Sequence, residues 1–290
     1  MIWNLGSINA DNFYDLPHLP GPGETLTATR FRQGLGGKGA NMSVAAARAG
    51  ARVMHIGATG ADGRWAAQRL FEYGVDIPHV AEVDSATGHA NIHIDPQGEN
   101  SIVIFAGANA DIDEQMIGAA LSEARPGDTL LLQNETSGQV YAAKTAKALG
   151  LRLIYAAAPF SAAAVAAILE DIDILVLNAV EAGQLHAATG RELDALPVGD
   201  VIVTLGSDGC KWISNTARTT RLFPAFPVVP VDTTGAGDTF TGYLASALDR
   251  SLPMPQAITL ASRAGALMVT RRGTADVIPD LREVQDHDFG

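Results

Sequence analysis

The sequence predicts an α/β protein of three layers, in which helices cover both faces of a mostly parallel β-sheet and a small second sheet lies apart. Short apolar runs alternate with longer segments of helical periodicity along most of the 290 residues, which is typical of a parallel sheet. Apolar residues make up 47% and charged residues 18% of the chain, so a large core can form. Two other segments alternate polar and apolar residues, as half-exposed strands do.

The main sheet and its helices follow from the order of these patterns along the chain. The apolar runs predict strands at Met1–Gly6, Val53–Ile56, Thr129–Leu132, Leu153–Tyr155, Ile174–Leu177 and Val201–Leu205. Helical periodicity predicts helices at Met42–Ala49, Trp65–Tyr73, Asp113–Ala124, Gln139–Leu149, Ala162–Leu169, Ala179–Thr189 and Pro255–Thr270, with another beginning near Asp238. Gly50 is placed to end the first of these helices.

The small sheet is expected from the alternating segments Glu24–Gln33 and Gly88–Asp95, with Ser101–Phe105 as a return strand after Gly98. The chain contains no internal repeat and no clear linker between domains. We therefore expect a single domain over residues 1–290, with the small sheet formed from about 10–34 and 88–106.

Composition excludes several classes of function. The formal net charge of −12 argues against a nucleic-acid or anionic-membrane partner. The chain shows neither a signal-peptide pattern nor an apolar run long enough to cross a membrane. One cysteine, Cys210, permits no internal disulfide, which fits a protein of the cytoplasm.

The most informative segment runs from Asp232 to Phe240. Gly235, Ala236 and Gly237 precede Asp238, and a helical pattern follows. A glycine turn that opens a helix leaves backbone N–H groups free and attracts phosphate. Asp238 adds a proton acceptor beside this anion site, which suits transfer of a phosphoryl group to a hydroxyl. The alternative is an ordinary tight turn with an acid at a helix start.

A second glycine cluster, Gly34 to Asn41, also leads into a helix. Gly34, Gly36 and Gly39 match the dinucleotide-binding pattern, but no acid follows the next strand as that fingerprint requires. A Walker-type phosphate loop needs Ser or Thr after Lys38, where Gly39 stands. Neither interpretation fits its context.

Taken in order, these segments resemble the phosphofructokinase-B (PfkB) family of carbohydrate kinases, and within it the ribokinase group. The resemblance rests on short matches spread over nearly the whole chain. They are Gly6–Asp11, Pro22–Thr25, Gly36–Asn41, Gly98–Asn100, Ala106–Asn109, Gln133 with Glu135, Asn178 with Glu181, Thr204–Gly206 and Asp232–Asp238. The resemblance implies a ribokinase-like three-layer sandwich whose small sheet is a lid over the sugar and pairs with a second subunit in a homodimer.

The family implies an ATP-dependent sugar kinase, with D-ribose converted to ribose 5-phosphate as the first expectation. Asp238 would be the catalytic base, and Gly235, Ala236 and Gly237 would form the anion hole. The sugar-binding residues carried over are Asn9, Asp11, Gly37, Lys38, Asn41, Glu135 and Asp238. By themselves, Asn9 and Asp11 are also ordinary turn residues, Lys38 an ordinary loop cation and Glu135 an ordinary surface acid.

The nucleotide site is likewise implied by the family. Asn178, Thr204, Gly206, Gly209 and Gly237 would contact ATP, and Glu181 would hold Mg²⁺ through water. Asn178 and Glu181 also fit a helix-capping pair, and both roles can hold together. A possible K⁺ site would comprise Asp232, Thr234, Met268, Arg271 and Gly273.

This sequence departs from the ribokinase pattern at three positions. Val277 stands where the group has a hydroxyl side chain, so one ligand of the K⁺ site is missing. Ser262 replaces a histidine near the adenine. Asn134 is polar beside the sugar, where an apolar residue is usual.

Other functions remain open from the residues alone. Within the class, the acceptor could be another pentose, a ketose or a nucleoside. Outside it, a sugar-binding regulator with a lapsed active site is less favoured because Gly235 to Asp238 is intact. A nicotinamide-dependent oxidoreductase is disfavoured by the missing acid.

Overall fold

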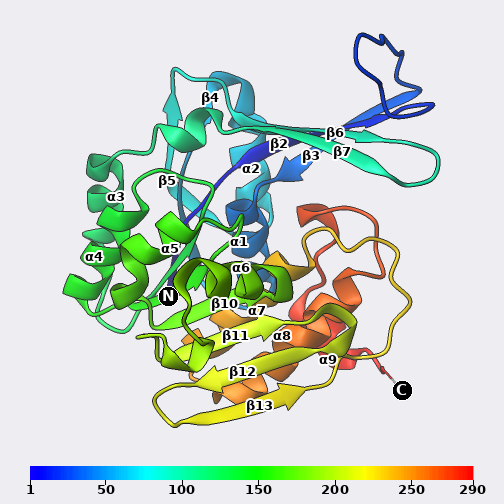
Figure 1. The fold of residues 1–290 in the computed structure, drawn as a ribbon. Helices are drawn as coiled ribbons and strands as arrows, with labels where there is room; N and C mark the ends of the chain where they lie inside the picture. Colours follow the sequence, from blue (N-terminus) through cyan, green and yellow to red (C-terminus); the bar gives the residue numbers. More distant parts are fainter. Residues whose placement is uncertain (290) are drawn as a thin grey trace.

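The computed structural model describes residues 1–289 and is built around a nine-stranded sheet (Figure 1). Its strands lie in the order β13-β12-β11-β10-β9-β8-β1-β4-β5. The pairs β11–β12 and β12–β13 are antiparallel, and all the other neighbours are parallel. The bounds are β1 Ile2–Leu5, β4 Val53–Gly60, β5 Asp76–Val83, β8 Thr129–Gln133, β9 Arg152–Ala156, β10 Ile174–Asn178, β11 Asp200–Thr204, β12 Cys210–Ser214 and β13 Thr219–Phe223. The predicted α/β class with a mostly parallel sheet is confirmed.

A separate four-stranded sheet projects from one end of the main sheet, at the upper right of Figure 1. Its order is β3-β2-β6-β7, with bounds β2 Asn9–Asp15, β3 Arg30–Gly36, β6 Gly88–Ile94 and β7 Asn100–Phe105. The small sheet expected beside the main layer is therefore present, and we call it the lid.

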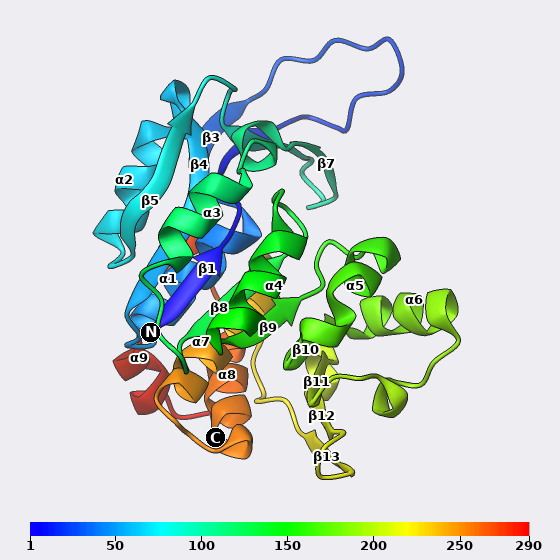
Figure 2. The same ribbon diagram turned by 90° about the vertical axis from the view of Figure 1, so that its left-hand side faces the viewer.

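Helices cover both faces of the main sheet (Figures 1 and 2). One face packs against α1 Lys38–Arg48, α2 Arg64–Glu72, α7 Ala236–Asp249, α8 Met254–Met268 and α9 Leu281–Asp286. The other packs against α3 Glu114–Leu121, α4 Gln139–Leu149, α5 Ala162–Ile168 and α6 Ala179–Thr189. Each face therefore has its own hydrophobic core, as a three-layer arrangement requires.

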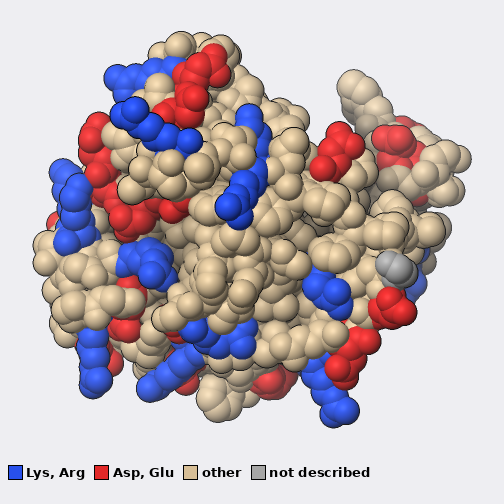
Figure 3. All heavy atoms as spheres, turned by 90° about the horizontal axis from the view of Figure 1, so that it is seen from below, with Lys and Arg blue, Asp and Glu red and all other residues tan. Residues whose placement is uncertain are grey.

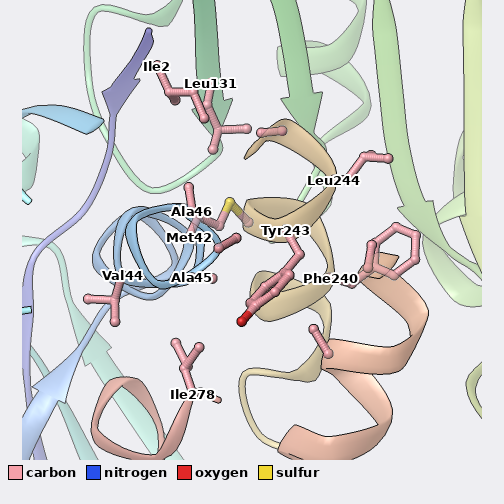
Figure 4. Close-up of a cluster of buried hydrophobic side chains, with 14 of the residues drawn as sticks. Ile2, Met42, Val44, Ala45, Ala46, Leu131, Phe240, Tyr243, Leu244 and Ile278 are labelled. Carbon is pink, nitrogen blue, oxygen red and sulfur yellow. The ribbon is translucent and has the colours of Figure 1, made fainter. Parts of the chain in front are cut away.

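The contact between α1 and α7 determines where the two glycine clusters meet. Met42, Ala45 and Ala46 of α1 face Tyr243 of α7 in Figure 4. A Cβ added at Gly242 would lie 2.5 Å from the Ala45 methyl and from the Met42 carbonyl oxygen, so glycine is needed for this close approach. As a result, the first turns of both helices lie at the same edge of the main sheet.

Several elements differ from the sequence predictions. Glu24–Gln33 is wrong as a strand over its first part, because β3 begins only at Arg30, opposite Asp15 of β2. Asn9 and Asp11 lie within β2 rather than in a simple exit from β1. The strands β5, β12 and β13 were not predicted. β13 is an exposed edge strand with a mostly polar sequence, so its pattern resembles a loop.

Charged side chains of both signs lie on the surface (Figure 3). On the face seen from below, basic side chains form separate groups with acidic ones among them (Figure 3). Over the described part of the chain, none of the helices has the length and apolar character needed to span a bilayer.

Candidate active site

The first turn of α7 carries the predicted base at the carboxyl edge of the main sheet. Gly235 precedes the helix in a left-handed conformation, with φ of 74°. Within residues 1–289, no acceptor pairs with the backbone N–H groups of Gly237 and Asp238, whereas that of Ala236 donates to the Thr233 carbonyl at 3.3 Å. The helix start thus offers two free donors where a negative charge is stabilised.

Asp238 is held between two side chains of the second glycine cluster. Its Oδ2 accepts a hydrogen bond of 2.9 Å from Asn41 Nδ2, and its Oδ1 lies 4.0 Å from Lys38 Nζ. Asp238 is the main reason why the pKa of Lys38 is raised above its ordinary value, against the opposing effect of burial. Because Asn41 Oδ1 has no hydrogen-bond partner although it is buried, this amide can still accept from a ligand.

A polar cavity of about 220 Å³ opens beside this pair. Its wall includes Lys38, Asp238 and Gly237 together with the ends of β10 and β11. Among the predicted residues, Asn178, Glu181, Thr204 and Gly235 also line it.

A larger cavity of about 650 Å³ lies on the other side of the α7 start. Predicted residues on its wall are Thr204, Gly206, Gly209, Ala236, Gly237 and Ser262. Residues from the loop after β13 and from α8 complete it, and most of them are apolar. Thr204, Thr233 and Gly237 belong to both cavities, so the two spaces meet at the free N–H groups of α7.

Glu135 lies against the second glycine cluster. Its Oε2 accepts hydrogen bonds from the Ser7 hydroxyl at 2.5 Å and the Lys38 backbone N–H at 2.9 Å. Gly37 makes this approach possible, because its φ is 92° and an added Cβ would lie 2.8 Å from the Ser7 carbonyl oxygen. Both hydrogen bonds use Oε2, so Oε1 is the oxygen available to a ligand.

Two polar residues of β2, Asn9 and Asp11, are buried beside the same cluster. Asn9 Oδ1 accepts from Asn109 Nδ2 at 2.8 Å. Burial, together with the charges of Glu135 and Asp238, raises the pKa of Asp11 from 3.8 to about 7, and Lys38 opposes this shift. Neither residue lines either cavity, and both belong to β2 of the lid.

Asn178 and Glu181 form a reciprocal capping box at the start of α6. Burial raises the pKa of Glu181, and the nearby charge of Lys38 opposes the effect. Within the described chain, no three His, Cys, Asp or Glu side chains are grouped as metal ligands. The Glu181 carboxylate on the wall of the smaller cavity fits Mg²⁺ that retains its waters and binds mainly through substrate oxygens.

Asp232 joins two loops behind the α7 start. Its Oδ1 accepts from the Thr234 N–H at 2.9 Å and its Oδ2 from the Gly273 N–H at 3.2 Å. An added Cβ at Gly273 would be 3.4 Å from both methyl groups of Val277, so apolar carbon occupies the place where a hydroxyl is usual. Carbonyl groups and Asp232 remain as oxygen donors for a monovalent cation.

The other residues predicted for the cation site have structural contacts. Arg271 donates to the Val277 carbonyl at 3.2 Å and pairs with Glu283. Met268 is fully buried, and its Cε would be 3.4 Å from a Cβ at Gly235. The side chains of Arg271 and Met268 thus support the loop, and only their carbonyls are suited to a cation.

Some residues of the candidate site were not predicted from the sequence. Ser7 was within a matched segment but was not assigned a role, although a small hydroxyl after Gly6 was a usable signal. The cavity-lining loop Ala225–Pro230 carries no motif. The Asn134 side chain accepts a hydrogen bond from the Tyr155 hydroxyl and donates one to the Pro159 carbonyl. Both of its polar atoms are therefore hydrogen-bonded within the protein.

Comparison with known proteins identifies the family. The pfkB family carbohydrate kinase model matches residues 2–281. This chain belongs to the PfkB family of carbohydrate kinases. It is therefore a carbohydrate kinase, as the resemblance predicted.

Relatives of this family that resemble the chain include sugar kinases of two names. A ribokinase of Haemophilus influenzae is 36% identical over 96% of this chain and 95% of its own length. A deoxyribokinase of Salmonella typhi is 28% identical over 98% of this chain and 97% of its own.

Solved structures of ribokinases share the fold. Ribokinase from Thermotoga maritima matches with a TM-score of 0.89 and 31% identity over 98% of both chains. Arabidopsis thaliana ribokinase complexed with ribose and ATP matches with a TM-score of 0.83 and 30% identity, covering 98% of this chain and 97% of the other.

Proposed function

We propose that this protein transfers the γ-phosphate of ATP to the primary hydroxyl of D-ribose and forms ribose 5-phosphate. The observation that carries the proposal is the meeting of the two cavities at the first turn of α7, beside the Asp238 carboxylate. The relatives named ribokinase and the Arabidopsis structure with ribose and ATP support the choice of substrates.

In this proposal Asp238 takes the proton of the hydroxyl while the hydroxyl oxygen attacks the γ-phosphorus. The bond from that phosphorus to the β-bridging oxygen breaks, and ADP leaves. Asn41 keeps the carboxylate oriented through its 2.9 Å hydrogen bond. The free N–H groups of Gly237 and Asp238 face the charge that develops, an effect worth about 3–4 kcal/mol for each well-placed donor. Ala236 contributes less because its N–H is partly engaged.

The sugar would lie between the lid and the α1 start. Asn9, Asp11 and Glu135 offer acceptors to vicinal hydroxyls, and Gly37 and Asn41 complete the contact. Lys38 lines the polar cavity, so its ammonium also faces the phosphoryl group in transit. A single cation in an otherwise acidic cluster favours a neutral sugar over a sugar phosphate.

The nucleotide would occupy the larger cavity, with its phosphates against Gly237 and its base towards Ser262. Thr204, Gly206 and Gly209 line this space. Asn178 would contact the triphosphate and Glu181 would hold Mg²⁺ through water, and that ion would neutralise phosphate charge. A monovalent cation, K⁺, would bind behind the α7 start through Asp232 and carbonyl oxygens. The lid would pair with a second copy in a homodimer of the cytoplasm.

The test is a coupled assay of ADP release with purified wild type and Asp238→Asn. We expect the wild type to release ADP only when ribose is present, and the variant to lose at least a thousandfold in kcat while still binding ribose. Asp208→Asn, an exposed acid on a neighbouring loop, is the matched control and should be fully active. A variant that keeps a tenth of the wild-type turnover would remove Asp238 from the role of base.

A second candidate acceptor, 2-deoxyribose, follows from the similarity to a deoxyribokinase. A site with several buried acceptors discriminates strongly against a substrate that lacks a hydroxyl. We therefore expect kcat/KM for ribose to exceed that for 2-deoxyribose by at least about tenfold. A higher kcat/KM for 2-deoxyribose than for ribose would instead identify the deoxy sugar as the substrate.

A further inference from the structure

The end of the chain is tied to the body of the protein by one arginine. Residues 287–289 follow α9 without regular secondary structure. Arg263 of α8 donates to the carbonyls of Val284 at 3.1 Å, Gln285 at 3.4 Å and His287 at 2.6 Å. Chain ends are ordered only where such contacts hold them, so Arg263 fixes the position of this tail.

The tail places an aromatic ring on Phe226. The ring centroids of Phe226 and Phe289 are 4.8 Å apart, and His287 packs edge-on against Phe289 at 4.5 Å. The Arg263 guanidinium lies 5.5 Å from the Phe226 ring and 4.7 Å from the Phe289 ring. These distances are within the range of aromatic pairing and cation–π attraction, so the four side chains form one cluster.

Phe226 is also part of the wall of the larger cavity. It belongs to the loop after β13, which has no helix or strand and is largely exposed. A loop of this kind does not hold a ring in place by itself. The contacts with Phe289 and Arg263 supply the missing support from behind the cavity wall.

Residues of α8 show where Phe226 lies along the larger cavity relative to the start of α7. Gly265 lies beside the start of α7, because an added Cβ would be 3.6 Å from the Ala236 carbonyl oxygen. Ser262 is about one helical turn earlier and also lines the cavity. The α7 start is the phosphate end, so Ser262 and the neighbouring cluster around Arg263 mark the base end.

We propose that Phe289, held by Arg263, fixes Phe226 as an aromatic wall against the base of the bound nucleotide. The inference rests on the proposed function, since it assigns the larger cavity to a nucleoside triphosphate. Ser262 offers only a short hydroxyl at this end, so the base is held chiefly by apolar and aromatic contact. Phe289 and Arg263 are positioning residues, and Phe226 is the residue that touches the base.

The experiment measures binding of two probes by calorimetry. ADP contains the base, and tripolyphosphate contains only phosphates. We expect Phe289→Ala to weaken ADP binding about fivefold or more, as loss of one aromatic contact does, with tripolyphosphate binding and KM for ribose unchanged. Phe289→Tyr should restore ADP binding. Phe71→Ala, which removes an exposed ring on α2, should match the wild type.

Two results would overturn the inference, and they differ from failure of the proposed function. If Phe289→Ala binds ADP as tightly as the wild type, the tail does not support the base. If Phe289→Ala weakens the binding of ADP and of tripolyphosphate equally, the tail acts through the general stability of the protein. Arg263→Lys leaves the aromatic rings intact. We expect it to weaken the binding of ADP and to leave the binding of tripolyphosphate unchanged. A wild type that binds neither probe would refute the nucleotide site itself.

Discussion

At the scale of single residues, the site is an acidic cluster with one cation. Asp11 and Asp238 are buried and Glu135 is partly buried, and the charge of Lys38 counteracts their repulsion at Asp11. Buried like charges raise the free energy of the folded state, and such strain is typical of functional sites. Bound sugar hydroxyls would relieve it by donating hydrogen bonds.

Asp11 therefore makes stability depend on pH. Its pKa of about 7 in the folded protein is above the ordinary 3.8, so the folded state binds this proton more tightly. The stabilisation is complete below about pH 4 and is lost as the pH rises through 7. We expect Asp11→Asn to raise the free energy of unfolding of the sugar-free protein at pH 8, by up to about 4 kcal/mol, and this gain to fall by more than half at pH 5.

Urea denaturation of the wild type and Asp11→Asn at both pH values measures this difference. Asp15→Asn, on the same strand but outside the acidic cluster, is the control. An equal effect of Asp11→Asn at pH 5 and pH 8 would show that Asp11 does not titrate in this range.

At the scale of elements, helices were predicted better than strands. Gln139–Leu149 and Ala179–Thr189 match the structure at both ends, because caps and periodicity act locally. β2 was missed because polar residues, Asn9, Asp11 and Asn12 among them, interrupt its apolar pattern. β12 and β13 form a hairpin at the edge of the sheet, so no helix follows β12 to mark them as parallel strands.

The contrast between local patterns and long-range contacts also explains which residues of the candidate site could be predicted. Motif residues at the α1 and α7 starts were predicted because glycine patterns are visible in sequence. The support of Glu135 by Ser7 and of Phe226 by Phe289 was not, because these pairs are 128 and 63 residues apart. Contacts of that separation follow from topology and leave no local pattern.

The loop behind the start of α7 leads to a prediction about the side chain of Val277. Val277 presents carbon to Gly273 where a hydroxyl would be a cation ligand. We expect Val277→Ser to lower the K⁺ concentration for half-maximal activity severalfold, because one oxygen donor is added. Activity is titrated with KCl at constant ionic strength, and Val277→Ala controls for the lost volume. If the alanine variant changes K⁺ activation as much as the serine variant, the hydroxyl is not a ligand.

At the scale of the whole molecule, the lid presents an apolar surface to solvent. Ile102, Val103, Ile104 and Phe105 on β7 are each at least half exposed, as is Phe31 on β3. β7 and β3 are also the edge strands of the lid. Exposed apolar edge strands are uncommon in monomers and typical of interaction surfaces.

We expect the protein to be a dimer at micromolar concentration and Ile104→Lys to make it a monomer. Sedimentation velocity measures both states. Leu222→Lys, on the exposed edge strand β13 of the main sheet, is the control and should remain dimeric. A wild type that sediments as a monomer would refute assembly through the lid.

The common wall of the two cavities has a consequence for inhibitor design. Thr204, Thr233 and Gly237 line both the smaller space and the larger, and none of them carries a bulky side chain. On the proposed function, one compound with an anionic group for the smaller space and a heteroaromatic tail for the larger would span both spaces without displacing the backbone. Resistance through enlargement of that boundary would block the natural reactants as well.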